Sequence, residues 1–359
     1  MLVIDENLFE ILPHIEQSDR IAMDTEADSI HCYPEKLCLI QLSTDKYHVL
    51  IDPLKNLNLD SLWKILKNKT IVLHAADYDI RLLYKRYGFV PSKIFDTMYG
   101  ARLLGHKQFG LSDLVKKYFG VKLEKSHQKA NWTTRPIPQH LLEYAINDTR
   151  YLLRLAEILQ TELQQTNRIH WHSETCEKLI ARIIDSINLN HDDEWRLPGS
   201  KNLSSLGLSV LKEIWLWREN EAVSSSKPPF FILPHNQLIS IAEAAACSED
   251  FTAFFPKNCS PKKISALTEA IQRGLKTPSE KRPVQIKNNG DHFPLKKIRF
   301  FNKMMKYRNN LASNLKIDPS LIASRAELIE ITKNPEKAPT VLMNWQFELL
   351  KNAISDKDV

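Results

Sequence analysis

The sequence predicts an α/β domain with a mixed sheet, followed by a region made only of helices. Short apolar runs typical of strands occur at 21–26, 37–42, 48–52 and 71–73, and helical patterns alternate with them from residue 59 onward. No comparable strand signal follows residue 205. Because strands that alternate with helices form an α/β domain, the change of pattern near residue 200 predicts a separate helical part.

The composition is typical of a globular protein. The chain has 359 residues, of which 43% are hydrophobic and 26% charged, enough for two or three domains. It contains no run of about 18 apolar residues, and Met1–Glu6 lacks the pattern of a signal peptide. We therefore expect a cytoplasmic protein that does not enter a membrane. The cysteines form no C-x-x-C pair, which argues against structural zinc and against a disulfide framework.

The elements of the α/β domain can be taken in order. A turn at Thr44-Asp45 separates the strands at 37–42 and 48–52, which predicts an antiparallel pair. Residues 1 to about 20 are expected to form a short helix before the strand at 21–26. The other predicted elements are a helix at 59–66, the strand at 71–73, a helix at 77–87, a strand at 94–95, a helix capped by Asp96 or Thr97, a helix at 111–118, a loop at 132–138, a helix at 141–163 and a helical run at 170–187.

The helical region contains an internal repeat. A shift of 90 residues aligns Trp217-Arg218 with Tyr307-Arg308 and Pro229 with Pro319. Two copies of one small helical unit explain this match without an insertion. The polar segments 188–205 and 277–294 are the expected linkers. The predicted boundaries are therefore 1–190 for the α/β domain and 205–276 and 293–359 for the two helical modules.

Positive charge is concentrated in one stretch of the sequence. The net charge is +6 and the isoelectric point is near 8.9, a weak hint of a polyanionic partner. Basic residues gather between Lys257 and Lys303, Lys287 among them. Such a stretch is either a solvated, lysine-rich linker or a surface that contacts phosphates, and the sequence leaves both open.

Two carboxylates lie one residue apart where the first predicted strand ends. Side chains alternate along a strand, so Asp24 and Glu26 project from the same face. A hard divalent cation such as Mg²⁺ would neutralise their repulsion. On this segment alone, a strand that ends in a polar turn is the simpler explanation.

Two further segments add carboxylates. Asp79 lies in the first turn of a predicted helix, where the helix dipole favours a negative charge. We expect Asp77 to cap this helix and the preceding His74 to be hydrogen-bonded, with metal ligation as the alternative. Tyr144 and Asp148 are four residues apart and therefore share a helix face. Their apolar neighbours predict burial, which an Asp tolerates only with a partner or a metal.

Asp24, Glu26, Asp79 and Asp148 together are four carboxylates from three separate segments. Phosphodiester hydrolysis uses such a cluster, because two divalent ions about 4 Å apart stabilise the attacking and the leaving oxygen. A nearby hydroxyl, here that of Tyr144, can help to align the attacking water. The combination predicts a hydrolase that depends on two divalent ions, Mg²⁺ or Mn²⁺.

The three motifs resemble those of a known family. Asp-x-Glu after a strand, His-x4-Asp at a strand-to-helix turn and Tyr-x3-Asp on a helix are similar to the DEDDy branch of the DnaQ-like 3′→5′ exonucleases, which have a ribonuclease H-like fold. The ribonuclease D family of this branch is more similar still, and the two helical modules resemble its HRDC domains, the second more loosely. Ala27 departs from the pattern, because the family often has an aromatic residue there. The segments that carry the closer resemblance are Pro34–Leu42, Asp52–Leu54, Asp96-Thr97, Trp132–Pro136, Tyr144–Leu153 and Trp217–Ala222.

The resemblance implies a role for each residue of the predicted site. Asp24 would bridge both metal ions, and Glu26 and Asp148 would hold the ion that activates water. Asp79 would support the second ion, directly or through water. Tyr144 would orient the nucleophile.

Three more residues are expected to bind substrate. Trp132 and Arg135 lie in the loop before the catalytic helix, where they would stack on a base and pair with a phosphate. Burial of Trp132 in the core is the alternative. His74 is the third residue of this set.

The resemblance implies a 3′→5′ exoribonuclease that releases nucleoside 5′-monophosphates, with tRNA precursors as substrates and helical modules that bind RNA. We expect a monomer. Two alternatives are the same chemistry on DNA and a non-catalytic RNA-binding protein on an exonuclease scaffold. The complete set of carboxylates and the tyrosine argue against the second alternative. The lack of a polymerase or helicase segment argues against the first.

Overall fold

The computed structural model describes residues 2–4, 8–55, 57–124, 130–188, 193–256, 259–285 and 294–355. The chain divides into two compact units. One unit comprises Met1–Glu26, Leu37–Ile187 and His292–Val359, and the other comprises Ala27–Lys36 and Asn188–Asp291. The α/β domain and the second helical module therefore belong to one unit, whereas the first helical module belongs to the other.

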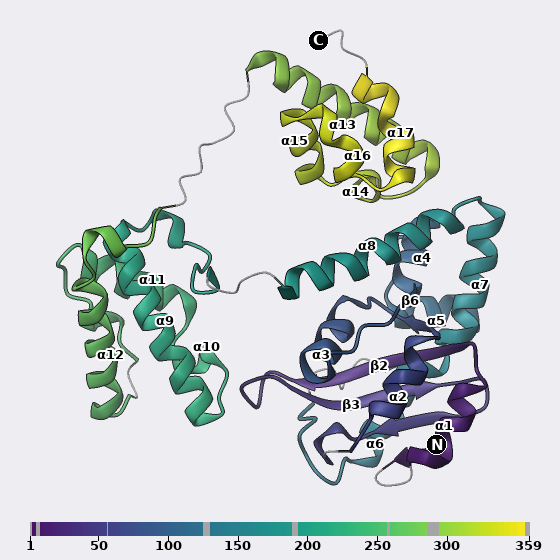
Figure 1. The fold of residues 1–359 in the computed structure, drawn as a ribbon, viewed down its shortest axis with the longest axis horizontal. Helices are drawn as coiled ribbons and strands as arrows, with labels where there is room; N and C mark the ends of the chain where they lie inside the picture. The colour runs from purple at the N-terminus through teal and green to yellow at the C-terminus, as the bar shows by residue number, and fades with distance from the viewer. Residues whose placement is uncertain are drawn as a thin grey trace. The chain divides into compact units, whose positions relative to one another are not determined.

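Six strands form one mixed sheet in the order β1-β4-β3-β2-β5-β6 (Figure 1). The antiparallel pair predicted from the turn at Thr44-Asp45 is confirmed as β3 and β4. The pairs β1–β4, β2–β5 and β5–β6 are parallel, so the sheet is mixed as expected. The strands are β1 (Leu2–Ile4), β2 (Arg20–Asp28), β3 (Lys36–Ser43), β4 (His48–Ile51), β5 (Thr70–Leu73) and β6 (Lys93–Asp96).

The prediction for the first twenty residues is partly wrong. The helix is present as α1 (Leu8–Glu16), but the strand β1 precedes it and pairs with β4. A strand of three residues is too short to show the period-two pattern by which a strand is recognised. Its pairing with a distant strand therefore decides its conformation.

The helices of the α/β domain follow the predicted order with one break. The single helix expected at 141–163 is two helices that meet at Tyr151, whose backbone caps both. Asp96 caps the helix after β6, because its side chain accepts hydrogen bonds from the backbone N–H groups of Met98 and Tyr99. The helices are α2 (Asp60–Lys67), α3 (Asp77–Tyr87), α4 (Thr97–Leu103), α5 (Leu111–Phe119), α6 (Gln139–Arg150), α7 (Leu152–Gln165) and α8 (Ile169–Asn188).

Helix α6 is fixed on the sheet by an apolar contact. Leu141, Ala145 and Ile146 are buried in one cluster with Leu39 of β3 and Leu50 of β4. Seven of the eight residues of β3 are buried, as expected for a strand covered on both faces. This packing fixes the orientation of the helix that carries Tyr144 and Asp148.

The two helical modules repeat each other in structure. The first contains α9 (Ser205–Ser225), α10 (Pro229–Ile232), α11 (His235–Ala246) and α12 (Pro261–Leu275), and the second contains α13 (Leu295–Leu315), α14 (Pro319–Ile322), α15 (Arg325–Lys333), α16 (Ala338–Val341) and α17 (Asn344–Ser355). A shift of 90 residues superimposes the bounds of α9 on those of α13 and the bounds of α10 on those of α14. The residues that end the long helices, Ser226 and Lys316, are both left-handed, with φ of 50° and 55°.

The second helical module (residues 294–355) shares an apolar core with the α/β domain. Trp171 of α8 stacks on Trp345 of α17, with ring centroids 4.6 Å apart. Arg168 donates a hydrogen bond of 2.9 Å to the carbonyl oxygen of Leu315. Lys178 forms an ion pair with Glu327. The module is therefore packed as part of the catalytic unit.

All five cysteines are free thiols. Among the described helices, none is long and apolar enough to cross a membrane.

Candidate active site

Three carboxylates from two elements meet at one place. Asp24 and Glu26 of β2 and Asp148 of α6 each offer an oxygen atom, and these oxygens lie within 4.8 Å of one another. The period of the strand places the first two on one face. The packing of α6 on the sheet brings the third to them. The convergence expected from the sequence is therefore present for these three residues.

The cluster lies in a cavity of about 470 Å³. Tyr144 and His74 line the cavity together with the carboxylates. A neighbouring cavity of about 330 Å³ also borders on Tyr144 and Asp148, so both residues lie between two hollows. Cavities of this size hold small ligands in other proteins.

Asp79 lies behind the cluster. Its side chain is buried, with 6% exposed, and its Oδ1 accepts a hydrogen bond of 2.5 Å from the hydroxyl of Thr25. Asp79 is close enough to Asp24 for its charge to raise the pKa of that carboxyl. The structure thus brings together three of the four predicted carboxylates, and holds the fourth beside them through a hydrogen bond.

The pKa values of all four carboxyls are raised. Burial is the main cause for each, because it disfavours the charged form. It raises the pKa of Glu26 to about 9, that of Asp148 to about 7 and that of Asp79 to about 6. The pKa of Asp24 lies well above its ordinary value, and the charges of its three acidic neighbours raise it further.

Tyr144 is a neutral hydrogen-bond donor in this site. Its hydroxyl donates to Asp148, and this bond acts to lower the pKa of that carboxyl. Burial and the nearby carboxylates raise the pKa of the phenol well above 10. The phenol therefore keeps its proton at neutral pH.

The donor set fits a hard divalent cation. The cluster consists of carboxylate oxygens, which are the ligands that Mg²⁺ and Mn²⁺ prefer. Like charges packed this closely raise one another's pKa, and a bound cation removes that repulsion. Proteins of the DnaQ-like exonuclease type depend on metal ions, and this acidic cluster is where such ions fit in the chain.

His74 and Asp77 also have definite partners. The imidazole of His74 forms a hydrogen bond of 2.9 Å with the hydroxyl of Thr97, as expected, and burial lowers its pKa to about 4. The expectation that Asp77 caps α3 is wrong. The cap position is Ala76, and Asp77 is the first helical residue, where it pairs with Arg81 at 2.6 Å. A pairing four residues along the same helix outweighs the cap.

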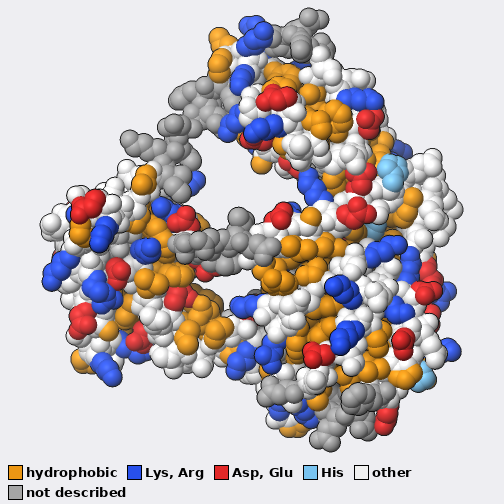
Figure 2. All heavy atoms as spheres, in the orientation of Figure 1, with side chains coloured by type: hydrophobic (Ala, Val, Ile, Leu, Met, Phe, Trp, Pro, Cys, Tyr) orange, Lys and Arg blue, Asp and Glu red, His pale blue; other side chains and the backbone are white. Residues whose placement is uncertain are grey.

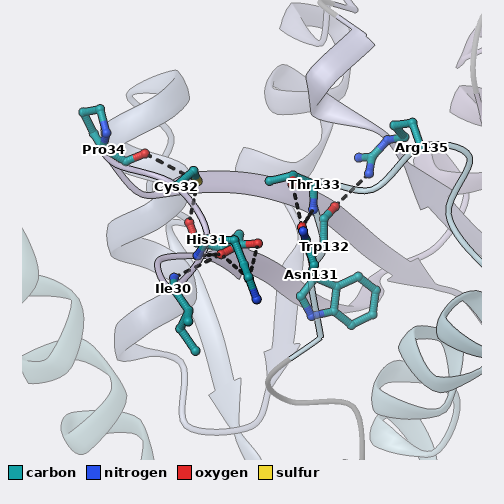
Figure 3. Close-up of polar contacts among 9 residues, drawn as sticks. Ile30, His31, Cys32, Pro34, Asn131, Trp132, Thr133 and Arg135 are labelled. Atoms are coloured by element: carbon teal, nitrogen blue, oxygen red, sulfur yellow. Dashed lines mark hydrogen bonds and ion pairs between the residues drawn. The ribbon is translucent and has the colours of Figure 1, made fainter. Parts of the chain in front are cut away.

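The loop before α6 is held by its own side chains (Figure 3). Arg135 donates a hydrogen bond to the carbonyl oxygen of Trp132, as Figure 3 shows. It also pairs with Asp52 through two hydrogen bonds of 2.6 and 2.8 Å, and it donates others to the carbonyl oxygens of Thr134 and Cys38. Its guanidinium is therefore hydrogen-bonded to other groups of the protein and is not part of a free binding surface. This is a structural role that the sequence did not indicate.

Trp132 lies in the core rather than at a surface where a base could stack. Its side chain is 1% exposed, in the cluster that joins α6 to β3 and β4. The ring centroids of Trp132 and Tyr144 are 6.2 Å apart. The burial considered as an alternative from the sequence therefore describes Trp132 in this structure.

The cavity has a wall that the sequence did not predict. This wall is lined by Gly110, Leu111 and Ser112 at the start of α5 and by Leu123 and Glu124, which follow that helix. No motif distinguishes these residues, because their place depends on how α5 packs.

Comparison with known proteins agrees with the fold. A model of the 3′-5′ exonuclease family matches residues 3–164, and a model of the HRDC domain matches residues 207–250. Ribonuclease D of Bartonella henselae is 28% identical over 355 residues, which cover 94% of this chain and 84% of that protein. Ribonuclease D of Haemophilus influenzae is 25% identical over 359 residues, which cover 96% and 89%.

A solved structure has the same fold along nearly the whole length. The crystal structure of Escherichia coli ribonuclease D, an exoribonuclease involved in structured RNA processing, has a TM-score of 0.80 at 23% identity and covers 99% of this chain and 97% of that one. The predicted architecture, an exonuclease domain with a mixed sheet and a helical region with an HRDC domain, is confirmed. This chain is therefore similar to ribonuclease D over almost its full length, and it matches the 3′-5′ exonuclease and HRDC family models.

Proposed function

We propose that this chain is a metal-dependent 3′→5′ exoribonuclease that removes nucleoside 5′-monophosphates from the ends of RNA. The observation that carries this function is the meeting of Asp24, Glu26 and Asp148 beside Tyr144 in one cavity. The similarity to ribonuclease D supports the direction of cleavage and the choice of RNA over DNA.

Two divalent ions, Mg²⁺ or Mn²⁺, are part of this proposal. Asp24, Glu26 and Asp148 would hold them, and Asp79 would support one from behind. When bound, such ions neutralise charge on both oxygens of an in-line displacement at phosphorus. The four raised pKa values support this assignment, because the crowded carboxylates lack a compensating charge of their own.

The protein's own groups would position the reactants. Because Tyr144 keeps its proton, its hydroxyl would orient the attacking water by hydrogen bonding rather than act as a base. Asp148 accepts from that hydroxyl and so fixes its direction. Trp132, buried in the core with its ring centroid 6.2 Å from that of Tyr144, would limit the movement of the tyrosine ring.

The cavity and the residues around it would also determine how the substrate binds. The cavity is large enough for a terminal nucleotide, and His74 on its wall would contact it as a neutral hydrogen-bonding group. Trp132 and Arg135 would shape the site indirectly, by holding the loop and α6. We propose tRNA precursors as natural substrates and a cytoplasmic monomer as the working form.

The test is a cleavage assay on a 5′-labelled RNA and a DNA strand of the same sequence, with and without Mg²⁺ or Mn²⁺. We expect a ladder that shortens from the 3′ end of the RNA, 5′-monophosphates as product, and no cleavage in EDTA. Faster cleavage of the DNA strand would favour the DNA alternative. RNA binding without cleavage in either metal would favour the non-catalytic alternative.

A further inference from the structure

We propose that Thr97 fixes His74 as a hydrogen-bond acceptor in the catalytic cavity, and that a sugar hydroxyl of the terminal nucleotide donates to this acceptor. The identity of the substrate rests on the proposed function. The state of the imidazole follows from the hydrogen bonds that hold it.

Two neighbouring strands bring His74 and Thr97 together. Strands β5 and β6 are parallel, and Leu73 at the end of β5 lies opposite Asp96 at the end of β6. His74 and Thr97 are the next residues of the two segments. In α/β sheets, ligands commonly bind at the carboxyl ends of parallel strands, and both residues follow such an end.

The hydrogen bonds of Thr97 determine which imidazole nitrogen carries the proton. A carbonyl oxygen only accepts, so the hydroxyl of Thr97 donates its single proton to the carbonyl of Leu73, at 3.0 Å. The same hydroxyl oxygen lies 2.9 Å from Nδ1 of His74. Because its proton is engaged, this oxygen accepts from Nδ1–H. A neutral imidazole has one N–H, so Nε2 keeps a lone pair and is an acceptor.

The acceptor nitrogen of His74 is available to a molecule in the cavity. Burial lowers the pKa of His74 to about 4, so the ring is uncharged at neutral pH. Within the described residues, only Nδ1 has a hydrogen-bond partner. His74 lines the cavity of about 470 Å³ that contains the carboxylate cluster. The two ring nitrogens point in different directions, so Nε2 is the one left for a ligand.

A strained turn holds His74 in place. Ala75 has a φ of 62°, in the left-handed region that residues other than glycine rarely adopt. The fully buried Asp96 accepts hydrogen bonds from the N–H groups of Ala75, at 3.2 Å, and Ala76, at 2.9 Å. Asp96 also caps α4, whose first residue is Thr97. One carboxylate thus positions both members of the His74–Thr97 pair, and backbone strain of this kind is frequent at functional sites.

The carboxylate cluster that fits a cation does not include His74. Oxygens of Asp24, Glu26 and Asp148 lie within 4.8 Å of one another, and in the described part of the chain no nitrogen of His74 joins this group. Mg²⁺ also prefers oxygen ligands to nitrogen. The lone pair of Nε2 is therefore left for a hydrogen-bond donor.

A phosphate group cannot be this donor, because its ionised oxygens only accept. Among the described residues that line the cavity, none is Lys or Arg. Figure 2 shows such side chains, in blue, spread over the face of the α/β domain that it displays. In the basic stretch of the sequence, Lys257 and Lys287 lie outside the described residues. The group that meets Nε2 must therefore be a hydroxyl or an N–H.

A sugar hydroxyl fits this requirement better than a base. Each base carries an N–H group, but at a different position, and an enzyme that removes successive nucleotides meets every base in turn. The sugar hydroxyls occupy the same positions in all nucleotides. At a 3′ end these are the 3′-hydroxyl and, in RNA alone, the 2′-hydroxyl.

The test uses short 5′-labelled RNAs that differ only in their last sugar. The four ends are ribose, 2′-deoxyribose, 2′-fluoro-2′-deoxyribose and 3′-deoxyribose. The 2′-fluoro group is a weak acceptor that cannot donate, so it separates the loss of a donor from a change in sugar shape. For each RNA, kcat/KM for removal of the last nucleotide is measured in Mg²⁺ and Kd is measured in EDTA.

Four variants of the full chain are compared with the wild type. His74→Phe keeps a ring but lacks the acceptor. Thr97→Val removes the hydroxyl, and Thr97→Ser restores it. His170→Phe is the control, because it makes the same change at an exposed position of α8. The readout is the ratio between two RNAs in the same protein, which does not depend on how much of a variant is folded.

We expect the wild type to prefer the ribose end over one of the deoxy ends by about tenfold, because that deoxy end leaves the acceptor unpaired. In His74→Phe this ratio should fall to about one. In Thr97→Val it should fall several-fold, since the ring can then present either nitrogen as donor. Thr97→Ser and His170→Phe should keep the wild-type ratio. If the 2′-hydroxyl is the donor, the 2′-fluoro end should behave like the 2′-deoxy end.

Three results would overturn the proposal wholly or in part. If His74→Phe keeps the wild-type ratios for both deoxy ends, His74 does not bind a hydroxyl. If it stops cleavage of every RNA and also weakens Mg²⁺ binding in a calorimetric titration, His74 is a metal ligand instead. If the ratio is lost in His74→Phe but kept in Thr97→Val, the role assigned to Thr97 is wrong.

The two readouts separate this proposal from the proposed function. Cleavage with ratios that do not depend on His74 leaves the function intact and removes the inference. If the wild type cleaves none of the RNAs, the function fails and the Kd values decide. A preference for the hydroxyl end that His74→Phe abolishes then upholds the inference, and equal Kd values for all ends overturn it.

Discussion

Thr25 lies between two of the site carboxylates, and its hydroxyl serves a third. The buried hydrogen bond from Thr25 to Asp79 measures 2.5 Å and joins β2 to α3. Thr25→Val keeps the shape but leaves a buried carboxylate without this donor. We expect Mg²⁺ to bind about tenfold more weakly, which is typical when a group that supports a metal ligand is lost. Calorimetric titration with Mg²⁺ measures this directly.

The conservative variant Thr25→Ser is the matched control, because it retains the hydroxyl. Its Mg²⁺ affinity should lie close to that of the wild type. If Thr25→Val binds Mg²⁺ like the wild type, Asp79 is positioned by other contacts.

Asp24 is the carboxylate on which the proposed chemistry depends most. Its pKa is raised by all three acidic neighbours, so it lies at the centre of the cluster. Asp24→Asn should lower kcat by at least about a thousandfold, because the metal ions that stabilise charge in the transition state lose a charged ligand. RNA binding in EDTA should persist. Asp77→Asn, on the neighbouring helix but paired with Arg81, should cleave normally, and wild-type activity in Asp24→Asn would exclude our assignment.

The raised pKa values predict how the stability of the metal-free protein depends on pH. Glu26 titrates near 4.5 when unfolded and near 9 when folded, and Asp148 shifts in the same direction to about 7. The folded state therefore binds more protons in this window, and the free energy of unfolding falls as pH rises through it.

Thermal unfolding in EDTA should thus give a lower Tm at about pH 8.5 than at about pH 6, and Mg²⁺ should raise Tm more at the higher pH. Glu26→Gln should flatten the pH dependence, because it removes a group whose pKa rises from 4.5 to about 9 on folding. An equal Mg²⁺ effect at both pH values would show that the carboxyls do not compete with the metal for protons.

At the scale of the element, the loop 131–138 is held to β3 and β4 by one side chain. Arg135 pairs with Asp52, which is 3% exposed. It also donates hydrogen bonds to three backbone carbonyl oxygens. Removing one partner of a buried ion pair leaves an uncompensated charge, so Arg135→Ala should destabilise the protein by about 3 kcal/mol. Chemical denaturation measures this loss.

A phosphate-binding Arg135 would behave differently. Its removal would then raise KM for RNA and leave Tm unchanged. A lowered Tm with normal KM on short RNA at low temperature is the result that the hydrogen bonds predict. The outcome separates the structural role from the substrate role inferred from the family resemblance.

At the scale of the whole molecule, the second helical module belongs to the catalytic unit although it contributes nothing to the cavity. Trp345 is 3% exposed and stacks on Trp171 of α8. Trp345→Ala should therefore lower the stability of the unit by about 3 kcal/mol or more. Phe231→Ala, at a side chain that is 61% exposed, is the control and should leave stability unchanged.

This packing also changes how the modules should be tested. A chain that ends near residue 205, the boundary suggested by the linker at 188–205, would expose the apolar surface around Trp171. We expect it to aggregate or unfold at a lower temperature, which light scattering and a thermal melt would detect. Loss of activity in such a truncation would therefore not show that the modules bind RNA.

The sequence by itself determined the order of most elements, the mixed sheet, the helical repeat and the residues of the acidic site. These features are encoded locally, by hydrophobic period, by the spacing of Asp24 and Glu26 along a strand and by that of Tyr144 and Asp148 along a helix. The site is predictable for the same reason, since its chemistry requires particular residue types at fixed positions in regular elements.

Only the tertiary structure decided the features that depend on contacts between distant segments. The strand β1 exists because β4 pairs with it, Asp79 points to Thr25 across 54 residues of sequence, and Arg135 is engaged by Asp52. Burial and pairing are properties of the folded chain, because they depend on what lies next to a residue in space and not on its neighbours in sequence.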